Sequence, residues 1–177
     1  MLKNKKIVML VGSGYEDLEF WVVYMRMIEE GADVKIVGLK KGEEYMSKTG
    51  GLKVKSEFET SEISPKEINA VLIPGGWAPD KLRRDEKILN LVRKVYENGG
   101  LVGMICHAGL VGISAGIVNG KKATGSTGIK DDLENAGAIW VDEPALRDGN
   151  IVWGRVVKDI FSNPVIIGPE YLRVNLL

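Results

Sequence analysis

The sequence contains only one cysteine and one histidine, and these two residues are neighbours, Cys106 and His107. A single cysteine cannot close a disulfide within the chain, and a single histidine cannot build a histidine-rich zinc site. We therefore expect no metal site and no cofactor. Any thiol chemistry must use Cys106, and any imidazole chemistry must use His107.

Excess charge and long apolar runs are also missing. Lys plus Arg total 24 and Asp plus Glu total 24, so the formal net charge is zero and predicts no basic surface for nucleic acid or anionic membrane. The apolar runs are too short to span a bilayer, and residues 7–11 are too short for the core of a signal peptide. We expect a cytoplasmic protein with neither a nucleic-acid nor a membrane partner.

What the sequence does contain is an alternation of short apolar runs with helical periodicity. The length favours one domain, residues 1–177. Apolar strands that alternate with helices predict an α/β protein with a flavodoxin-like parallel sheet sandwiched between helices. The terminal segment 162–177 is left unassigned because Pro164 and Pro169 would interrupt a helix there. The expected strands are 6–11, 33–38, 52–58, 70–74, 101–105, 122–124, 138–141, 145–147 and 151–153, and the expected helices are 17–30, 65–68, 84–98, 107–115 and 129–136.

Three turns follow predicted strands and carry unusual residues. They are 12–17 (GSGYED), 74–80 (PGGWAPD) and 105–109 (ICHAG). Sites in doubly wound sheets form at the carboxyl ends of the strands. We therefore expect these three turns to converge on one point.

Cys106 directly follows an apolar strand and directly precedes a helix, as in a nucleophile elbow. A helix N-terminus favours thiolate, so we expect Cys106 to ionise well below the free-thiol pKa of roughly 8.5. The alternative is a buried, inert cysteine, the commoner fate of a lone one. His107 is either the general base or a packing residue, and spacing alone does not decide between them.

The other two turns supply further candidates, each with a plain structural alternative. Glu16 could donate a hydrogen bond to the sulfur if it is protonated, or it could be a solvated acid at a helix N-terminus. Asp80 could be an acid of the site or a helix cap. Gly75 and Gly76 could offer backbone N–H groups as an oxyanion hole, or they could form an ordinary tight turn.

Ordered motifs over roughly residues 5–160 carry a family resemblance. They are YEDLE at 15–19, VLIPGGWAPD at 71–80, ICHAG at 105–109, ISAG at 113–116, GIKDDLENAG at 128–137, WVD at 140–142 and GRVV at 154–157. These segments resemble the PfpI/ThiJ family of intracellular cysteine proteases, glyoxalases and stress proteins, which has a class I amidotransferase-like fold. A class I glutamine amidotransferase itself is excluded, because the chain has no second histidine.

The resemblance implies a role for each candidate. Cys106 matches the nucleophile, His107 the histidine beside it, and Glu16 the acid that hydrogen-bonds the thiol. Gly75 and Gly76 match the oxyanion donors, and Asp80 matches an acid that a neighbouring subunit supplies to the histidine. The family's usual Gly-Pro after the histidine is replaced here by Ala108-Gly109. Its usual aromatic-proline pair before the GIK motif is replaced by Ser126-Thr127.

Three functions follow from this resemblance. The first is a peptidase-type cysteine hydrolase, active as a homo-oligomer (a dimer or a hexamer), on a peptide substrate. The second is a cofactor-free glyoxalase or deglycase that acts on small carbonyl compounds. The third is a redox-sensing or chaperone-like stress protein in which Cys106 is oxidised.

Overall fold

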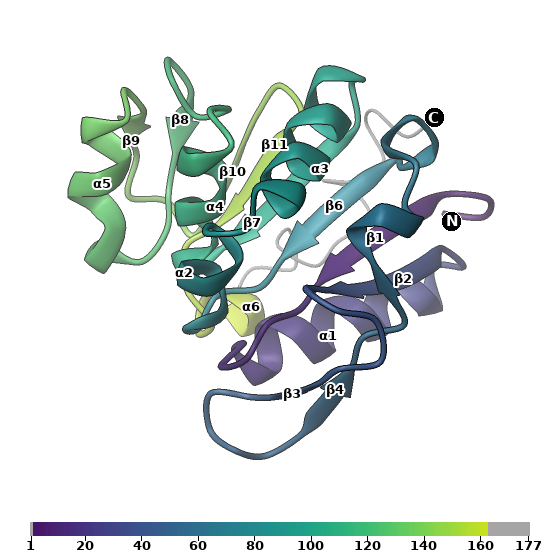
Figure 1. The fold of residues 1–177 in the computed structure, drawn as a ribbon. Helices are drawn as coiled ribbons and strands as arrows, with labels where there is room; N and C mark the ends of the chain where they lie inside the picture. The colour runs from purple at the N-terminus through teal and green to yellow at the C-terminus, as the bar shows by residue number, and fades with distance from the viewer. Residues whose placement is uncertain (1, 163–177) are drawn as a thin grey trace.

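A computed structural model describes residues 2–162, and its centre is a seven-stranded sheet. The strand order is β10-β11-β7-β6-β1-β2-β5, and every neighbouring pair is parallel except β10 and β11 (Figure 1). The predicted α/β class and mostly parallel sheet are confirmed. The strands are β1 (Lys6–Leu10), β2 (Asp33–Gly38), β5 (Phe58–Glu59), β6 (Ala70–Ile73), β7 (Leu101–Ile105), β10 (Ala145–Asp148) and β11 (Ile151–Gly154).

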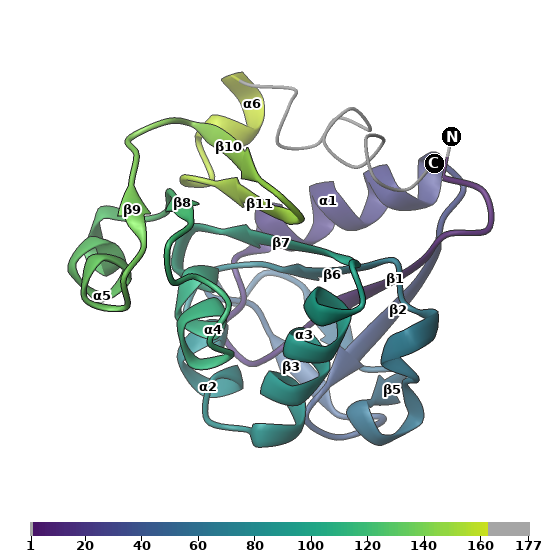
Figure 2. The same cartoon turned by 90° about the horizontal axis from the view of Figure 1, so that it is seen from above.

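Helices cover both faces of this sheet, as Figure 2 shows. One face carries α1 (Asp17–Glu29) and α6 (Asp159–Ser162), and the other carries α2 (Ala78–Leu82), α3 (Glu86–Glu97) and α4 (Gly109–Ser114). Strands β6 and β7 are buried along their whole length because they lie in the middle of the sheet between two helical layers. Their continuous apolar sequence follows from burial on both faces.

Two smaller units attach to this core. Strands β3 (Glu44–Met46) and β4 (Lys53–Lys55) form an antiparallel hairpin. Strands β8 (Lys122–Ala123) and β9 (Ile139–Trp140) form a parallel pair beside α5 (Lys130–Asn135). Short 3-10 turns link the elements at η1 (Thr60–Glu62), η2 (Pro65–Glu67), η3 (Cys106–Ala108) and η4 (Thr127–Ile129).

The structure corrects the sequence prediction between residues 40 and 82. The expected strand 52–58 is divided, because β4 pairs with β3 and only β5 joins the main sheet. Helix α2 was not predicted, since residues 74–80 were interpreted as a turn. The unassigned residues 163–177 lie outside the described part of the chain. None of the helices within residues 2–162 is long and apolar enough to cross a membrane.

Helix α1 is correctly predicted, but the residues that it buries are not the apolar residues from which the helix was predicted. Leu18, Met25 and Ile28 marked the helix in the sequence, and their side chains are 40%, 60% and 45% exposed. The face that packs on the sheet carries Glu19, Phe20, Val23 and Met27. The carboxyl group of Glu19 thus occupies a core position, and this position matters for the site.

Candidate active site

The three turns named from the sequence meet at the carboxyl ends of β1, β6 and β7. These strands are adjacent, with β6 between the other two. The amide of Glu16 donates to the carbonyl of Gly75 at 3.2 Å, and the amide of Trp77 donates to the carbonyl of Gly14 at 2.7 Å. The turn after β7 lies against the same point, because a Cβ built on Gly75 would be 2.8 Å from Cβ of Cys106. The predicted convergence is confirmed.

Cys106 occupies a strained elbow between β7 and α4. Its backbone φ is +59°, and besides Asn4 it is the only non-glycine residue with positive φ in residues 2–162. Such a conformation costs about 1–3 kcal/mol and persists only where the surrounding structure imposes it. The amide of Ser126 donates to the Cys106 carbonyl at 3.2 Å and helps to hold the turn. The predicted elbow is confirmed.

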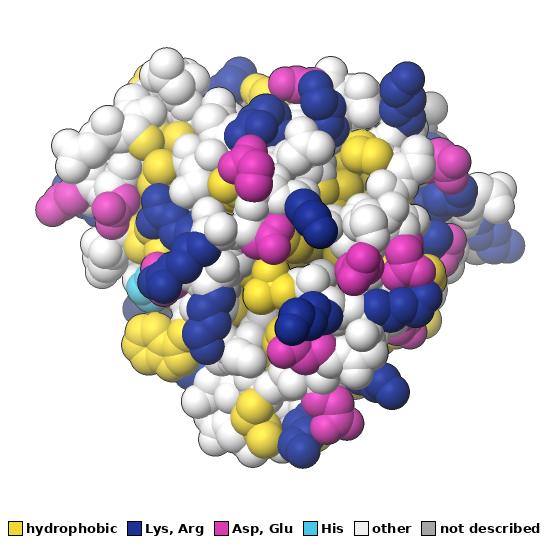
Figure 3. All heavy atoms as spheres, in the orientation of Figure 1, with side chains coloured by type: hydrophobic (Ala, Val, Ile, Leu, Met, Phe, Trp, Pro, Cys, Tyr) yellow, Lys and Arg dark blue, Asp and Glu magenta, His cyan; other side chains and the backbone are white. Residues whose placement is uncertain are grey.

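His107 places its ring beside the thiol. Its Nδ1 lies 3.2 Å from Sγ of Cys106, within hydrogen-bond reach for a group that contains sulfur. Burial, and secondarily the cation of Lys48, lower the pKa of His107, so the imidazole is neutral at pH 7 and can accept a proton. In Figure 3 this single histidine, in cyan, reaches the surface between basic and hydrophobic side chains. Trp77 is one aromatic neighbour, with ring centroids 6.4 Å apart.

The acid beside the thiol is Glu19, which corrects the assignment of that role to Glu16. Glu16 caps α1, because its Oε2 accepts a hydrogen bond from the amide of Glu19 at 2.8 Å. Glu19 lies one helical turn further on, fully buried, and its Oε2 accepts from the amide of Gly75 at 2.6 Å. The same carboxyl interacts with the Cys106 thiol. The spacing i, i+3 therefore decides which of two nearby glutamates enters the site.

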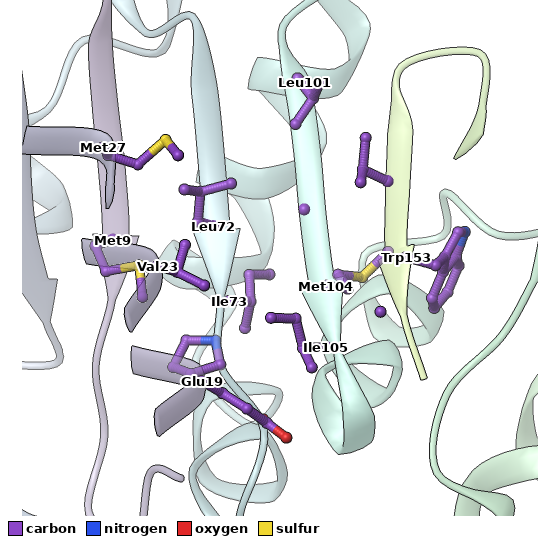
Figure 4. A pocket seen from close by; sticks show the side chains of 14 residues that line it. Met9, Glu19, Val23, Met27, Leu72, Ile73, Leu101, Met104, Ile105 and Trp153 are labelled. Carbon is purple, nitrogen blue, oxygen red and sulfur yellow. The ribbon is translucent and has the colours of Figure 1, made fainter. Parts of the chain in front are cut away.

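Burial keeps Glu19 protonated at neutral pH. Desolvation raises its pKa to about 8, against the lowering effect of the Gly75 amide. Figure 4 shows Glu19 at one end of a mainly apolar pocket, which lies between α1 and the strands of the sheet. Its Oε1 is buried and has no conventional hydrogen-bond partner in the described chain, so a proton there is free to be donated toward the sulfur. The pocket is lined by residues that include Met9, Val23, Met27, Leu72, Ile73, Met104 and Trp153.

The pKa of Cys106 moves in the direction opposite to the expectation from its place before a helix. Burial, and the charge of Glu19 once that carboxyl ionises above about pH 8, raise the thiol pKa to about 12, against the lowering effects of the His107 and Gly76 amides and of Lys48. The helix that follows is short, only Gly109–Ser114, and its first residues are not preceded by a side-chain cap. At pH 7 the cysteine is therefore a thiol, and it needs the neutral imidazole of His107 as its base.

The oxyanion donors also differ from the predicted pair. The Gly75 amide is already used by Glu19. The backbone amides of Gly76 and His107 are the ones that lower the pKa of the Cys106 thiol. An oxygen that develops on a carbon bound to this sulfur would lie near the same two donors. Of the predicted pair, only the Gly76 amide is directed to the sulfur, and the role of an oxyanion donor stays a prediction.

Asp80 does not approach His107 within one chain. It lies on α2, its side chain is 54% exposed, and it forms an ion pair with Arg84 in the turn after this helix. No carboxylate among the described residues hydrogen-bonds His107. A triad of cysteine, histidine and acid is therefore not assembled within one chain.

Lys48 is a further residue of the site that was not found from the sequence. It acts electrostatically on Glu19, Cys106 and His107. It lies between β3 and β4, in the polar segment 40–51 that the sequence predicts to be a loop or hairpin. Among residues 2–162 no group of three or more His, Cys, Asp or Glu side chains could hold a metal ion.

Comparisons with known proteins show the family of the chain. Residues 5–163 match the model of the DJ-1/PfpI family. A deglycase of Pyrococcus horikoshii is 38% identical over 89% of this chain and 93% of its own length. A Bacillus subtilis protein named "Putative cysteine protease YraA" is 36% identical over 89% of this chain and 92% of its own. A two-domain structure from Anabaena variabilis with DJ-1/ThiJ/PfpI-like and ferritin-like domains superimposes with a TM-score of 0.90 at 34% identity, over 96% of this chain and 47% of that one.

Proposed function

Because the chain belongs to the DJ-1/PfpI family, we propose that it is a cofactor-free deglycase that removes small dicarbonyl adducts from amines. The observation that carries the proposal is that two groups able to transfer protons, the imidazole of His107 and the carboxyl of Glu19, lie beside Cys106. A neutral imidazole lies 3.2 Å from the thiol, and a buried carboxyl with a pKa of about 8 interacts with the same thiol. The reaction needs one group that accepts a proton and one that donates a proton at the same carbon.

The first step transfers the adduct from the amine to the enzyme. His107 Nδ1 accepts the proton of Cys106, and the sulfur forms a bond to the carbon that carries the amine and a hydroxyl group. The carbon–nitrogen bond breaks, and the amine leaves with a proton from Glu19. Glu19 suits this role because burial holds its proton until the leaving nitrogen accepts it. The product is a hemithioacetal on Cys106 and the free amine.

The second step is an isomerisation followed by hydrolysis. The proton on the sulfur-bearing carbon moves to the adjacent carbonyl carbon through an enediolate, so the first carbon is oxidised and the second is reduced. The amides of Gly76 and His107 face the oxygen next to the sulfur and stabilise its negative charge. The resulting thioester is hydrolysed by water, which releases a 2-hydroxy acid and restores the thiol. The proton that His107 accepted in the first step returns to Glu19, so both groups regain their starting states.

The test is to incubate the protein with methylglyoxal adducts of an amino acid and to follow lactate and the freed amine together. We expect equal amounts of both, formed at a rate that follows the adduct concentration. Lactate formation that follows only the free methylglyoxal in equilibrium would overturn the deglycase assignment. The Cys106→Ala variant is the control for uncatalysed breakdown.

A peptidase-type hydrolysis is the second candidate, favoured by the Bacillus subtilis relative. It requires an acid for His107, and within one chain Asp80 is paired with Arg84 instead. Cleavage of a fluorogenic peptide that depends on Cys106, without lactate formation from the adducts, would support the peptidase and reject the deglycase.

A further inference from the structure

Lys48 lies at the mouth of the site and is exposed. Its Nζ is 5.0 Å from the centroid of the Trp77 ring, and that ring neighbours His107. Lys48 and Trp77 thus form one wall beside the reactive pair. Trp77 is 58% exposed, so this wall faces the solvent from which a substrate enters.

The backbone that carries Lys48 is fixed to the site by hydrogen bonds. The Lys48 amide donates to the carbonyl of Tyr15 at 2.8 Å, and the carbonyl of Met46 accepts from the amide of Gly14 at 2.8 Å. Tyr15 also forms a bridge to Gly76, which lies beside the thiol. The lysine therefore projects from a segment whose position is set by the same turn that builds the site.

No carboxylate of the described chain neutralises this lysine. Lys48 makes neither an ion pair nor a side-chain hydrogen bond within residues 2–162, and its side-chain contact is the face of Trp77. By contrast, Lys53 of the same hairpin pairs with Glu44 at 3.6 Å. Lys48 also acts electrostatically on both Cys106 and His107. One unpaired positive charge beside a reactive sulfur attracts a single negative charge.

We propose that Lys48 selects carbonyl substrates that carry a carboxylate close to the carbon attacked by Cys106. This inference rests on the proposed function for the identity of the reaction, but not for the recognition itself. In the deglycase reaction it favours adducts on the α-amine of an amino acid with a free carboxylate. The lysine would hold the carboxylate at the Trp77 wall and direct the adduct carbon to the sulfur.

Two alkylating reagents, one anionic and one neutral, test the recognition of a carboxylate without any turnover. Iodoacetate and iodoacetamide react with Cys106 by the same displacement, but only iodoacetate is an anion. Lys48→Met keeps the apolar stem on Trp77 and removes the charge, so we expect the ratio of the iodoacetate rate to the iodoacetamide rate to fall at least threefold. Any change in the thiol pKa alters both rates equally and cancels in the ratio.

Matched variants and substrates complete the test. Lys48→Arg should keep the ratio within twofold of the wild type, and so should Lys53→Met, which removes a charge from the same hairpin. With turnover, kcat/KM for the methylglyoxal adduct of alanine relative to that of alaninamide should fall at least threefold in Lys48→Met. An unchanged alkylation ratio would overturn the role of Lys48. A changed alkylation ratio with no turnover of either adduct would retain the anion selection and reject the deglycase function.

Discussion

The backbone of Cys106 holds a side chain in the left-handed region, where a Cβ is unfavourable. This conformation projects the sulfur toward His107 Nδ1 and the amides of Gly76 and His107. The energy for this strain comes from the packing of β7 and α4, which continue on either side. A residue held in this way contributes to reactivity and little to the stability of the fold.

We expect Cys106→Ala to abolish turnover and to leave the melting temperature unchanged or slightly higher. Cys106 is only partly buried, so loss of its thiol leaves no closed core cavity. Cys106→Ser should also be inactive, because a hydroxyl is the weaker nucleophile. Lactate release and a thermal melt measure the two effects. Retained activity together with a melting temperature several degrees lower would identify Cys106 as a structural residue.

Glu19 makes the stability of the fold depend on pH. Its pKa is about 8 in the folded chain and 4.5 as an ordinary carboxyl, so above pH 4.5 the unfolded chain loses this proton first. The contribution is therefore fully favourable below pH 4.5 and is lost as the pH rises to about 8. At roughly 1.4 kcal/mol per pH unit, the loss is on the order of 4–5 kcal/mol. We expect Glu19→Gln to be more stable than the wild type at pH 8–9 by a few kcal/mol.

Urea denaturation of both proteins between pH 4.5 and 9 measures this difference. Other titrating groups are shared by the two proteins, so the difference isolates Glu19. Glu19→Asp keeps a titratable carboxyl and should keep the pH dependence, although its shorter side chain reaches the Gly75 amide less well. A difference between Glu19→Gln and the wild type that does not vary with pH would show that Glu19 is ionised in the folded chain.

Among the elements, the turn after β6 is the one that joins the three parts of the site. Gly76 has φ of +75°, and a Cβ there would clash with the Gly14 carbonyl oxygen and lie 2.7 Å from the Glu16 amide nitrogen. The contact is with backbone, which cannot move aside as a flexible side chain can. The close approach of the turns after β1 and β6 therefore requires glycine at this position.

We expect Gly76→Ala to lower the free energy of unfolding by about 3 kcal/mol or more and to abolish turnover. About 1–2 kcal/mol is the cost of alanine at positive φ, and the remainder is the backbone clash. The matched control is Gly116→Ala, where φ is +73° and a Cβ would meet nothing within 4 Å. Denaturant titration of both variants separates the two contributions. Equal destabilisation would show that the clash is relieved by a small shift and that conformation alone sets the cost.

The strand and helix order could be predicted from the sequence because apolar runs and helical spacing are local signals. The convergence of three turns followed from the geometry of a parallel sheet. The face of α1 could not be predicted in the same way, since Leu18, Met25 and Ile28 mimic a buried stripe. Glu19, Val23 and Met27 recur at intervals of four and mark the face of α1 that is buried. Because the first of them is a glutamate, the sequence does not indicate this face as an apolar one.

The remaining differences at the site depend on contacts between distant segments. Lys48 is 58 residues from Cys106 in the sequence, and only the pairing of its hairpin with Tyr15 brings it to the sulfur. The use of the Gly75 amide by Glu19 likewise depends on the packing of α1 against β6. Local sequence patterns contain neither contact. The family motifs therefore indicate which chemical roles the site needs, but not which residue fills each role.

For the molecule as a whole, several large apolar side chains are exposed to solvent. Leu18, Met25 and Ile28 follow one another along α1, and Trp77 stands at the mouth of the site. Scattered apolar side chains are normal on a monomer, but a row along one helix is typical of a surface that contacts another chain. His107 also lacks an acid within its own described chain. Both features are consistent with the expected homo-oligomer.

We expect the protein to be a closed homo-oligomer at micromolar concentration, with a mass by light scattering that is a multiple of one chain. If Asp80 serves His107 of a neighbouring subunit, Asp80→Asn should reduce peptide hydrolysis at least tenfold. The same variant should change the stability by less than 1 kcal/mol, because its ion pair with Arg84 is exposed. Arg84→Met is the control, since it frees Asp80 without removing the carboxylate. A monomer would reject both the assembly and the shared triad, whereas an oligomer whose Asp80→Asn variant is fully active would reject the triad alone.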